Sequence, residues 1–219
     1  MIKRSTVAGL ATGLAATAIF GLCSTAHADT LVPLPGGDIT QTLSDGTVVT
    51  VRLVGESATI SPSMGATPAH RNAWVSASAQ VELSGPNANG GKIYPGYVVG
   101  CQVTLNGGGV NGGVDAKTDW EGKKPEIGGK AGGTLSLGPG QARAMYLLDE
   151  EEADDFGKES HKARNKFNGT SGSVTWADST IGVKGCAGYA QARAFVRVKV
   201  STTTVNSVVT LWGQPFSLG

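Results

Sequence analysis

Apolar and polar residues alternate along several stretches of the chain, as in β-strands that turn one face toward a core. The pattern predicts strands over residues 47–53, 73–83, 195–200 and 205–212. Turns rich in Gly, Pro and Asn separate them, for example Asp45-Gly46 and residues 85–91. Short strands between such turns are typical of a sandwich or barrel, so we expect an all-β fold.

The most regular alternation lies between residues 97 and 137. Apolar residues occupy the odd positions of 97–105, and after Gly107-Gly108-Gly109 they occupy the even positions of 110–120. A glycine run can form a bulge that changes the phase of a strand. Residues 121–125 form a turn, and 127–137 alternate again. We therefore predict a long β-hairpin with one apolar and one hydrophilic face.

The length of this hairpin allows two interpretations. Each arm has about eleven residues, which span roughly 36 Å, or roughly 26 Å when tilted by about 45°, close to the apolar band of an outer-membrane barrel. Trp120, at the tip of the apolar face, fits an anchor at the membrane interface. Two strands cannot cross a bilayer alone, because their edges leave backbone groups unpaired in hydrocarbon. Either the hairpin is an exposed arm of a soluble domain, or several copies close one barrel around a water-filled interior.

The first 28 residues have the organisation of a secretory signal peptide. Lys3 and Arg4 precede a mostly apolar stretch over 7–22, and Ala26-His27-Ala28 is a small-x-small cleavage site. We expect the mature chain to begin at Asp29. Export to an oxidising compartment leaves two cysteines, Cys101 and Cys186, which we expect to form a disulfide.

Charge and composition exclude some classes of function. The 18 basic and 17 acidic residues nearly balance, which disfavours a nucleic-acid binder. The mature chain has only His70 and His161 as histidines, and a Gly-x-Gly-x-x-Gly match at 107–112 precedes a strand pattern rather than the helix that a dinucleotide site needs. We therefore expect no enzyme, no cofactor and no metal site. A secreted β-sandwich that binds a partner remains the alternative to a membrane channel.

Residues 147–166 carry the densest charge in the chain. The pattern favours a solvated loop or short helix, since Asp154 and Lys158 have helical spacing. A second interpretation is a cluster that attracts cations. Its acidic residues are Asp149, Glu150, Glu151, Glu152, Asp154 and Asp155.

Four stretches, taken in order, resemble the MspA-like porin family of mycolate-containing actinobacteria. They are Leu43-Ser44-Asp45-Gly46 with Thr50-Val51, Gly96-Tyr97-Val98-Val99-Gly100, Ala194-Phe195-Val196-Arg197, and Ser207-Val208-Val209-Thr210 through Trp212-Gly213-Gln214-Pro215-Phe216. The resemblance implies a goblet-shaped octamer. Each protomer would give a β-sandwich (about 29–105 and 140–219) to a rim and a hairpin (about 106–138) to a 16-stranded transmembrane barrel.

The resemblance also implies a function and its partners. The family lets ions and small hydrophilic solutes diffuse across the mycolate outer membrane, so the expected partners are other copies of the chain, with or without a related porin subunit, and the lipids of that membrane. The expected pore-lining residues are Asn111, Asp115, Lys117, Asp119, Glu121, Glu126 and Lys130. A ring of acidic residues attracts cations, so we expect a cation preference. Basic residues interleave the acidic ones here, where the family has adjacent aspartates, and this weakens the expected preference. The resemblance places the acidic run 149–155 on the rim.

Overall fold

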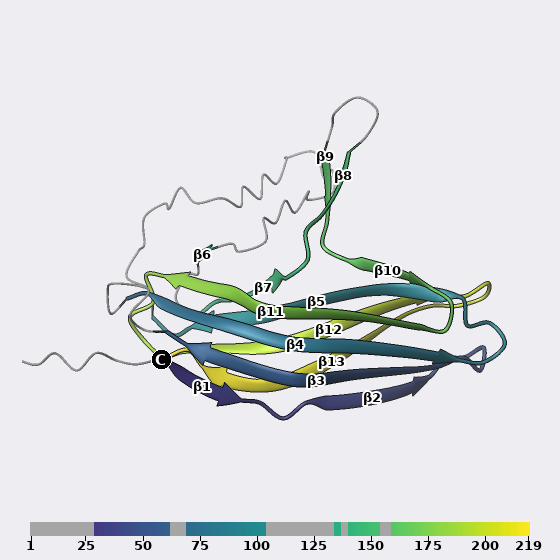
Figure 1. The fold of residues 1–219 in the computed structure, drawn as a ribbon, viewed down its shortest axis with the longest axis horizontal. Helices are drawn as coiled ribbons and strands as arrows, with labels where there is room; N and C mark the ends of the chain where they lie inside the picture. The colour runs from purple at the N-terminus through teal and green to yellow at the C-terminus, as the bar shows by residue number, and fades with distance from the viewer. Residues whose placement is uncertain (1–28, 62–68, 104–133, 137–139, 154–158) are drawn as a thin grey trace, which may run out of the picture.

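A computed structural model describes residues 29–61, 69–103, 134–136, 140–153 and 159–219. These residues form an all-β fold in which two extended sheets lie face to face (Figure 1). Nearly all strand pairs are antiparallel. The predicted all-β sandwich is therefore confirmed.

Sheet A has the strand order β1-β3-β4-β11-β6, and β2 pairs with β3 beyond the end of β1. Its strands are β1 (Thr30–Pro33), β2 (Gly37–Thr42), β3 (Val48–Ile60), β4 (Arg71–Ser84), β6 (Thr134–Ser136) and β11 (Ser171–Lys184). Both β3 and β11 contain a register shift against β4. In β11 the shift is next to Asp178, whose φ of 50° is in the left-handed region.

Sheet B has the strand order β10-β5-β12-β13, and β7 also pairs with β5. Its strands are β5 (Gly90–Cys101), β7 (Ala142–Tyr146), β10 (Asn165–Asn168), β12 (Ala190–Ser201) and β13 (Asn206–Ser217). β10 pairs with β5 at Gly90–Ile93, and β7 pairs with β5 at Gly96–Gly100. Two short strands therefore share one edge of β5, with a gap at residues 94–95.

A two-stranded hairpin leaves the sandwich through this gap. It consists of β8 (Glu150–Ala153) and β9 (Glu159–Lys162), which pair only with each other. Figure 1 shows it standing away from the long strands. We call the described residues of this hairpin, 149–153 and 159–162, the acidic arm.

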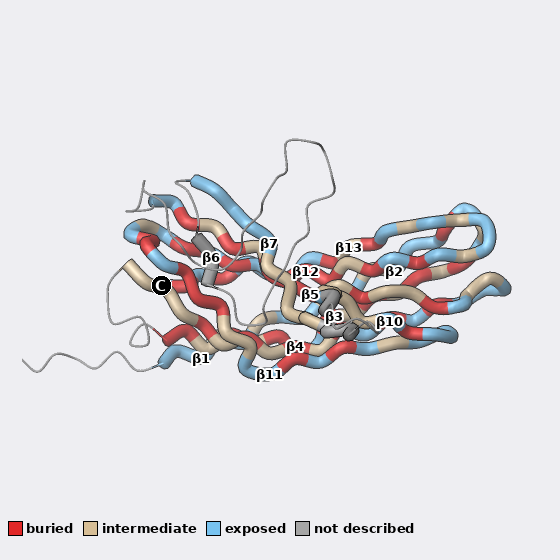
Figure 2. The backbone as a smooth tube through the Cα atoms, turned by 90° about the horizontal axis from the view of Figure 1, so that it is seen from above, coloured by how far each residue is buried: buried red, intermediate tan, exposed pale blue. Residues whose placement is uncertain are grey.

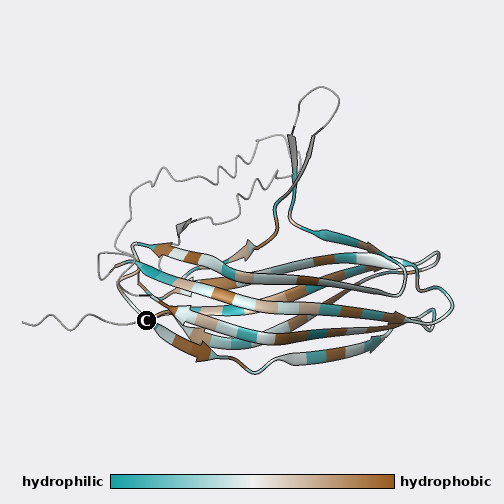
Figure 3. Ribbon diagram, viewed as in Figure 1, coloured by the Kyte–Doolittle hydropathy of each residue, from teal (hydrophilic) through white to brown (hydrophobic). Residues whose placement is uncertain are grey.

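The core lies between the two sheets and is built from alternate residues of each strand. In β12, Ala192, Val196 and Val198 are fully buried, while Arg193 and Lys199 on the opposite face are exposed. Figure 2 shows this alternation of buried and exposed positions along the long strands, and Figure 3 shows the matching alternation of hydropathy. Burial of apolar area is the main favourable term in folding.

The strands predicted from alternation are present. Residues 47–53 lie mostly within β3, 73–83 within β4, 195–200 within β12 and 205–212 mostly within β13. The strand expected from Tyr97 begins earlier, because Gly90 and Gly91 pair with β10 and β12 rather than remaining in the turn.

The loop or short helix predicted over residues 147–166 is wrong. The described part of this region forms β8, β9 and the start of β10. The register places Glu150 opposite Lys162 and Glu151 opposite His161. Charges placed opposite one another across an antiparallel pair are compatible with a hairpin, whereas the prediction rests on the helical spacing of Asp154 and Lys158 alone.

Candidate functional site

The two ends of the segment 104–139 lie side by side at one end of sheet B. The backbone N–H of Gly140 donates to the carbonyl of Cys101 over 3.2 Å, and the N–H of Cys101 donates to the carbonyl of Gln141 over 3.4 Å. Beyond them, β5 and β7 pair with Gly100 opposite Ala142. The chain therefore leaves sheet B after Cys101 and rejoins it at Gly140 beside the point of departure, as an inserted hairpin requires. We call this place the insertion base.

A disulfide fastens the insertion base to sheet A. The predicted bond between Cys101 and Cys186 is present, with an S–S distance of 1.98 Å and a Cα–Cα distance of 5.9 Å. Cys101 ends β5, and Cys186 follows β11. Backbone hydrogen bonds reinforce the link, from Ala187 N–H to Val103 O (3.0 Å) and from Gln102 N–H to Tyr189 O (2.9 Å). The base is thus tied to both sheets of the sandwich.

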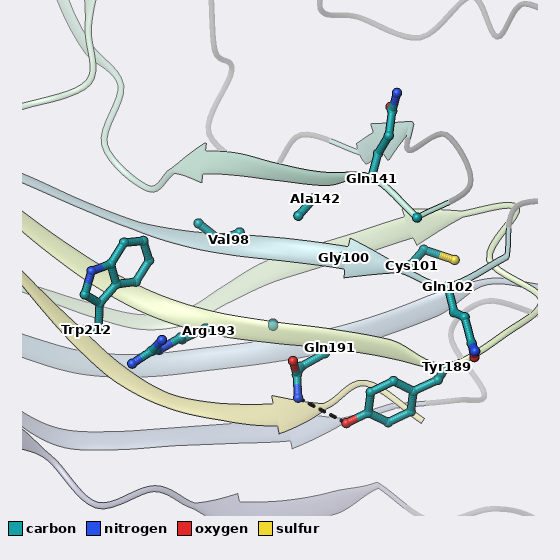
Figure 4. A pocket seen from close by; sticks show the side chains of 12 residues that line it. Val98, Gly100, Cys101, Gln102, Gln141, Ala142, Tyr189, Gln191, Arg193 and Trp212 are labelled. Carbon is teal, nitrogen blue, oxygen red and sulfur yellow. Dashed lines mark hydrogen bonds between the residues drawn. The ribbon is translucent and has the colours of Figure 1, made fainter.

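A hollow of about 640 Å³ opens beside the insertion base (Figure 4). Its lining is formed by Val98, Gly100, Cys101, Gln102, Gly140, Gln141, Ala142, Tyr189, Gln191, Ala192, Arg193 and Trp212. Gln191 Nε2 donates to Tyr189 Oη over 3.2 Å, and the Arg193 guanidinium lies 5.2 Å from the centre of the Trp212 ring. This lining has one charged side chain and lacks a paired acid, base and nucleophile, so it suits contact with another surface better than catalysis.

Aromatic rings line the outer face of sheet B. The ring centres of Tyr94 and Tyr146 are 6.4 Å apart, those of Tyr146 and Phe195 5.5 Å, and those of Phe195 and Trp212 5.8 Å. Arg197 donates to Tyr146 Oη over 3.2 Å and lies over the ring of Phe195. Phe195 is only 2% exposed although it lies on the face away from the core. Sequence analysis missed this row; the available signal was a Phe on the same face as Arg197 and Lys199.

The expected pore-lining residues lie outside the described residues. They are Asn111, Asp115, Lys117, Asp119, Glu121, Glu126 and Lys130. The signal peptide, residues 1–28, is outside them too. Of the expected hairpin 106–138, the structure describes Thr134–Ser136, which form β6 and pair in parallel with Gly182–Lys184 of β11. These three residues belong to sheet A, so the second arm of the hairpin is expected to end before Thr134.

The structure brings part of the expected acidic cluster together. Asp149 Oδ1 lies 2.9 Å from His161 Nδ1, at the foot of the acidic arm. Glu150, Glu151 and Glu152 follow one another along β8. Asp154 and Asp155 lie outside the described residues. In the described part of the chain, no group of three or more His, Cys, Asp or Glu residues is placed to hold a metal ion.

A buried carboxyl group was not anticipated from the sequence. Glu56 is 2% exposed and lies at the register shift of β3, and neither of its carboxylate oxygens has a hydrogen-bond partner among the described residues. A Cβ at Gly213 would be 2.7 Å from Glu56 Oε2, so the carboxyl group packs closely against β13. Burial raises the pKa of Glu56 to about 7. Burial also raises the pKa of the nearby Tyr97.

The fold and the insertion base define a class of protein: an all-β sandwich with a long insertion tied at its base to both sheets. A comparison with protein-family models identifies that class. The model described as MspA matches residues 45–217, and the chain belongs to this family of oligomeric outer-membrane porins, which is not a family of enzymes. No curated protein matches the chain. Where the chain is described, it contains no helix long and apolar enough to cross a membrane.

Proposed function

We propose that this protein forms a water-filled channel in a mycolate outer membrane, through which ions and small hydrophilic solutes diffuse. Several copies would each contribute the hairpin of about residues 106–133 to one closed barrel, and the sandwiches would form the rim. Membership of a porin family is the observation that carries the proposal.

The insertion base supports this assignment independently of the family match. A barrel built from several chains requires each hairpin to leave its sandwich at a defined position and angle, since every strand must meet a neighbour from another copy. The hydrogen bonds of Gly140 and Gln141 to Cys101 join the two segments that flank residues 104–139, and the disulfide holds these segments to sheet A. The inserted hairpin would therefore begin and end at a fixed position on the sandwich.

Export and assembly complete the proposal. The signal peptide over residues 1–28 would direct the chain across the inner membrane, and the oxidising compartment beyond it suits the Cys101–Cys186 disulfide. We propose a ring of like subunits, eight in the family pattern, with or without a related porin chain. Electron microscopy of the detergent-extracted particle counts the subunits directly.

We further propose that the channel prefers cations. Asp115, Asp119, Glu121 and Glu126 are on the inserted hairpin, and repetition around a ring would focus a negative potential on the pore. Lys117, Lys123, Lys124 and Lys130 oppose this effect, so the preference is expected to be modest. Acidic residues of the rim cluster that face solution would add to it.

Conductance of the purified protein in a planar bilayer tests the channel. The proposal predicts stepwise openings that carry small ions of both signs at high salt. A persistent absence of steps from protein shown to be oligomeric would reject it.

The hollow beside the insertion base favours one alternative, a secreted β-sandwich that binds a partner through this surface. Tyr189 and Trp212, which line the hollow, are 53% and 45% exposed, more than is usual for such large side chains. This alternative predicts a water-soluble monomer that needs no detergent. Size measurement without detergent distinguishes the two proposals.

A further inference from the structure

Three lysines on neighbouring strands, Lys92, Lys166 and Lys199, lie side by side on the outer face of sheet B, and we call them the lysine row. Lys92 of β5 is directly opposite Lys166 of β10 on one side and Lys199 of β12 on the other. Like charges placed directly opposite one another destabilise a sheet, so this lysine row is an arrangement that folding alone does not favour. Lys166 and Lys199 are exposed, and Lys92 is half-buried.

Nothing in the described part of the chain neutralises the row. None of the three lysines forms an ion pair there, and Lys199 Nζ lies 5.5 Å from the centre of the Tyr94 ring. The five strands of sheet B contain no Asp or Glu, and Arg193 and Arg197 extend the positive charge along β12. Among the described residues, the face therefore has no anionic partner.

The lysine row borders a shallow hollow of about 300 Å³. Asn89 and Asn168, whose side chains can donate hydrogen bonds, line it together with Lys92, Lys166 and Lys199. A set of ammonium and amide donors around a hollow is complementary to carboxylates or phosphates.

The acidic arm has the complementary charge. The residues of the arm, 149–153 and 159–162, include five acidic residues against one lysine, and Glu150, Glu151 and Glu152 are consecutive in β8. The arm leaves sheet B at its edge, between β7 and β10, and stands away from its own sandwich (Figure 1). We propose, on the basis of the proposed porin ring, that the acidic arm of one copy docks on the lysine row of the next.

The dimensions of the two surfaces agree. The four residues of β8 cover roughly 10 Å from the first to the last, and a row across three neighbouring strands also spans roughly 10 Å. A contact between the edge of one subunit and the face of the next joins two different surfaces. Repeated by rotation, such heterologous contacts generate a closed ring.

The position of the row favours a protein over an anionic lipid as its occupant. Lys92 is nine residues along β5 from Cys101, which places the row roughly 30 Å from the insertion base. If the hairpin lies in the bilayer, the row is on the part of the rim away from it. The carboxylates of a neighbouring arm are then a source of negative charge that lies outside the bilayer.

Charge reversal of the two surfaces tests the proposal in full-length, detergent-extracted protein. The row variant combines Lys92→Glu, Lys166→Glu and Lys199→Glu, and the arm variant combines Glu150→Lys, Glu151→Lys and Glu152→Lys. Because like charges across an interface repel, each variant alone should give at least about tenfold less ring than the natural protein. The single change Lys184→Glu, an exposed lysine on sheet A, serves as the control and should assemble normally.

Co-expression of the row and arm variants distinguishes docking between neighbouring chains from docking within one chain. In an even-numbered ring with the two variants alternating, every contact again joins opposite charges, so rings and channels should return. The proposal is overturned if either variant alone assembles normally, because the reversed surface then makes no essential contact. Recovery only when both changes are on one chain would instead mean that the arm docks on its own sandwich.

A third outcome would identify a different occupant. If the row variant fails to assemble and neither co-expression nor the combined variant restores it, the row binds something other than the arm, such as an anionic lipid headgroup, and the proposal is wrong. Circular dichroism and an intact disulfide show that each variant has folded. These outcomes differ from failure of the porin proposal, because in that case the natural protein itself would give no channel.

Discussion

At the residue scale, two buried groups determine properties that the strand pattern does not reveal. Glu56 lies in the apolar interior, where its oxygens have no hydrogen-bond partner among the residues that the structure describes, and Phe195 covers Gly96 on the face away from the core. Both are consequences of packing between strands far apart in sequence. Each gives a prediction that can be tested with one substitution.

We predict that Glu56 makes the stability of the sandwich fall as the pH rises from about 4.5 to about 7. Its pKa is about 7 when folded and 4.5 at its ordinary value, so the unfolded chain loses its proton first. The contribution of Glu56 to stability is therefore fully present below pH 4.5, and about 3 kcal/mol of it is lost by pH 8. Melting temperatures from pH 4 to 8 should show this slope in the natural protein and a flatter one in Glu56→Gln.

Glu82→Gln is the matched control for Glu56. Glu82 is on the neighbouring strand β4, is exposed and pairs with Arg52 over 2.9 Å. The Glu82→Gln substitution should leave the dependence of the melting temperature on pH unchanged. If Glu56→Gln and the natural protein show the same pH dependence, the carboxyl of Glu56 is already ionised or hydrated in the folded state.

Gly96 is the second test at this scale. A Cβ there would overlap the carbonyl oxygen of Met145 and the ring of Phe195. We expect Gly96→Ala to destabilise the protein by about 1–3 kcal/mol, as overpacking does. Near-ultraviolet circular dichroism should also change, because Phe195 packs on Trp212.

Gly100→Ala is the corresponding control on the same strand. The nearest atom to a Cβ at Gly100 is Ala142 Cβ at 3.6 Å, an ordinary contact. This variant should differ from the natural protein by less than about 1 kcal/mol. Equal losses from both substitutions would show that the packing of Phe195 on Gly96 is not what constrains position 96.

At the element scale, the disulfide joins strands of the two sheets at the insertion base. The two cysteines are 85 residues apart in sequence, so the bond removes much of the freedom of the unfolded chain. We predict that Cys101→Ser with Cys186→Ser lowers the free energy of unfolding by about 2–5 kcal/mol. Reducing agent should lower the melting temperature of the natural protein and leave that of the double variant unchanged.

A further prediction at this scale concerns the inserted hairpin. Asp119→Asn with Glu121→Gln should lower the cation-to-anion permeability ratio, because a ring of negative charge near the pore is lost. The reversal potential in a salt gradient measures the ratio. Lys184→Glu, on sheet A, should leave it unchanged. An unchanged reversal potential in the double variant would remove these two residues from the pore lining.

The elements that sequence predicted well are those whose pairing is local or whose alternation is uninterrupted. β4 was predicted over most of its length, and β3, β12 and β13 were predicted on one side of their register shifts, where alternate residues stay buried. β11 was missed, since its bulge at Trp176–Ser179 breaks the period of two. β8 and β9 were missed because their charges fit a helix as well as a hairpin.

The candidate site was predictable only in part, for a related reason. The Cys101–Cys186 pair follows from export chemistry, and the structure confirms it. The lysine row and the aromatic row on sheet B require strand register, because their members come from strands separated by up to about a hundred residues. Without the register of the strands, the sequence alone does not indicate that Lys92 lies beside both Lys166 and Lys199.

At the scale of the whole molecule, two parts of the chain leave the sandwich at different places. The insertion base lies where residues 104–139 begin and end, and the acidic arm leaves the edge of sheet B between β7 and β10. A porin of this family needs both a barrel and a ring that holds the barrel strands in register. In our account the insertion supplies the barrel, and contacts between sandwiches supply the ring.

The most direct test of this account is cysteine accessibility along the first arm of the hairpin, measured as block of single-channel conductance. Single cysteines would replace the polar residues at positions 111, 115, 117 and 119 and, as matched controls, the apolar residues at positions 110, 114 and 116. Cys101 and Cys186, the two cysteines that follow the expected signal peptide, are paired in the disulfide and do not react. We predict that a charged, water-borne thiol reagent reduces conductance at the polar positions and has no effect at the apolar ones, because strands alternate faces. Equal block at both sets, or no block at either, would contradict a barrel whose water-filled interior is lined by this hairpin.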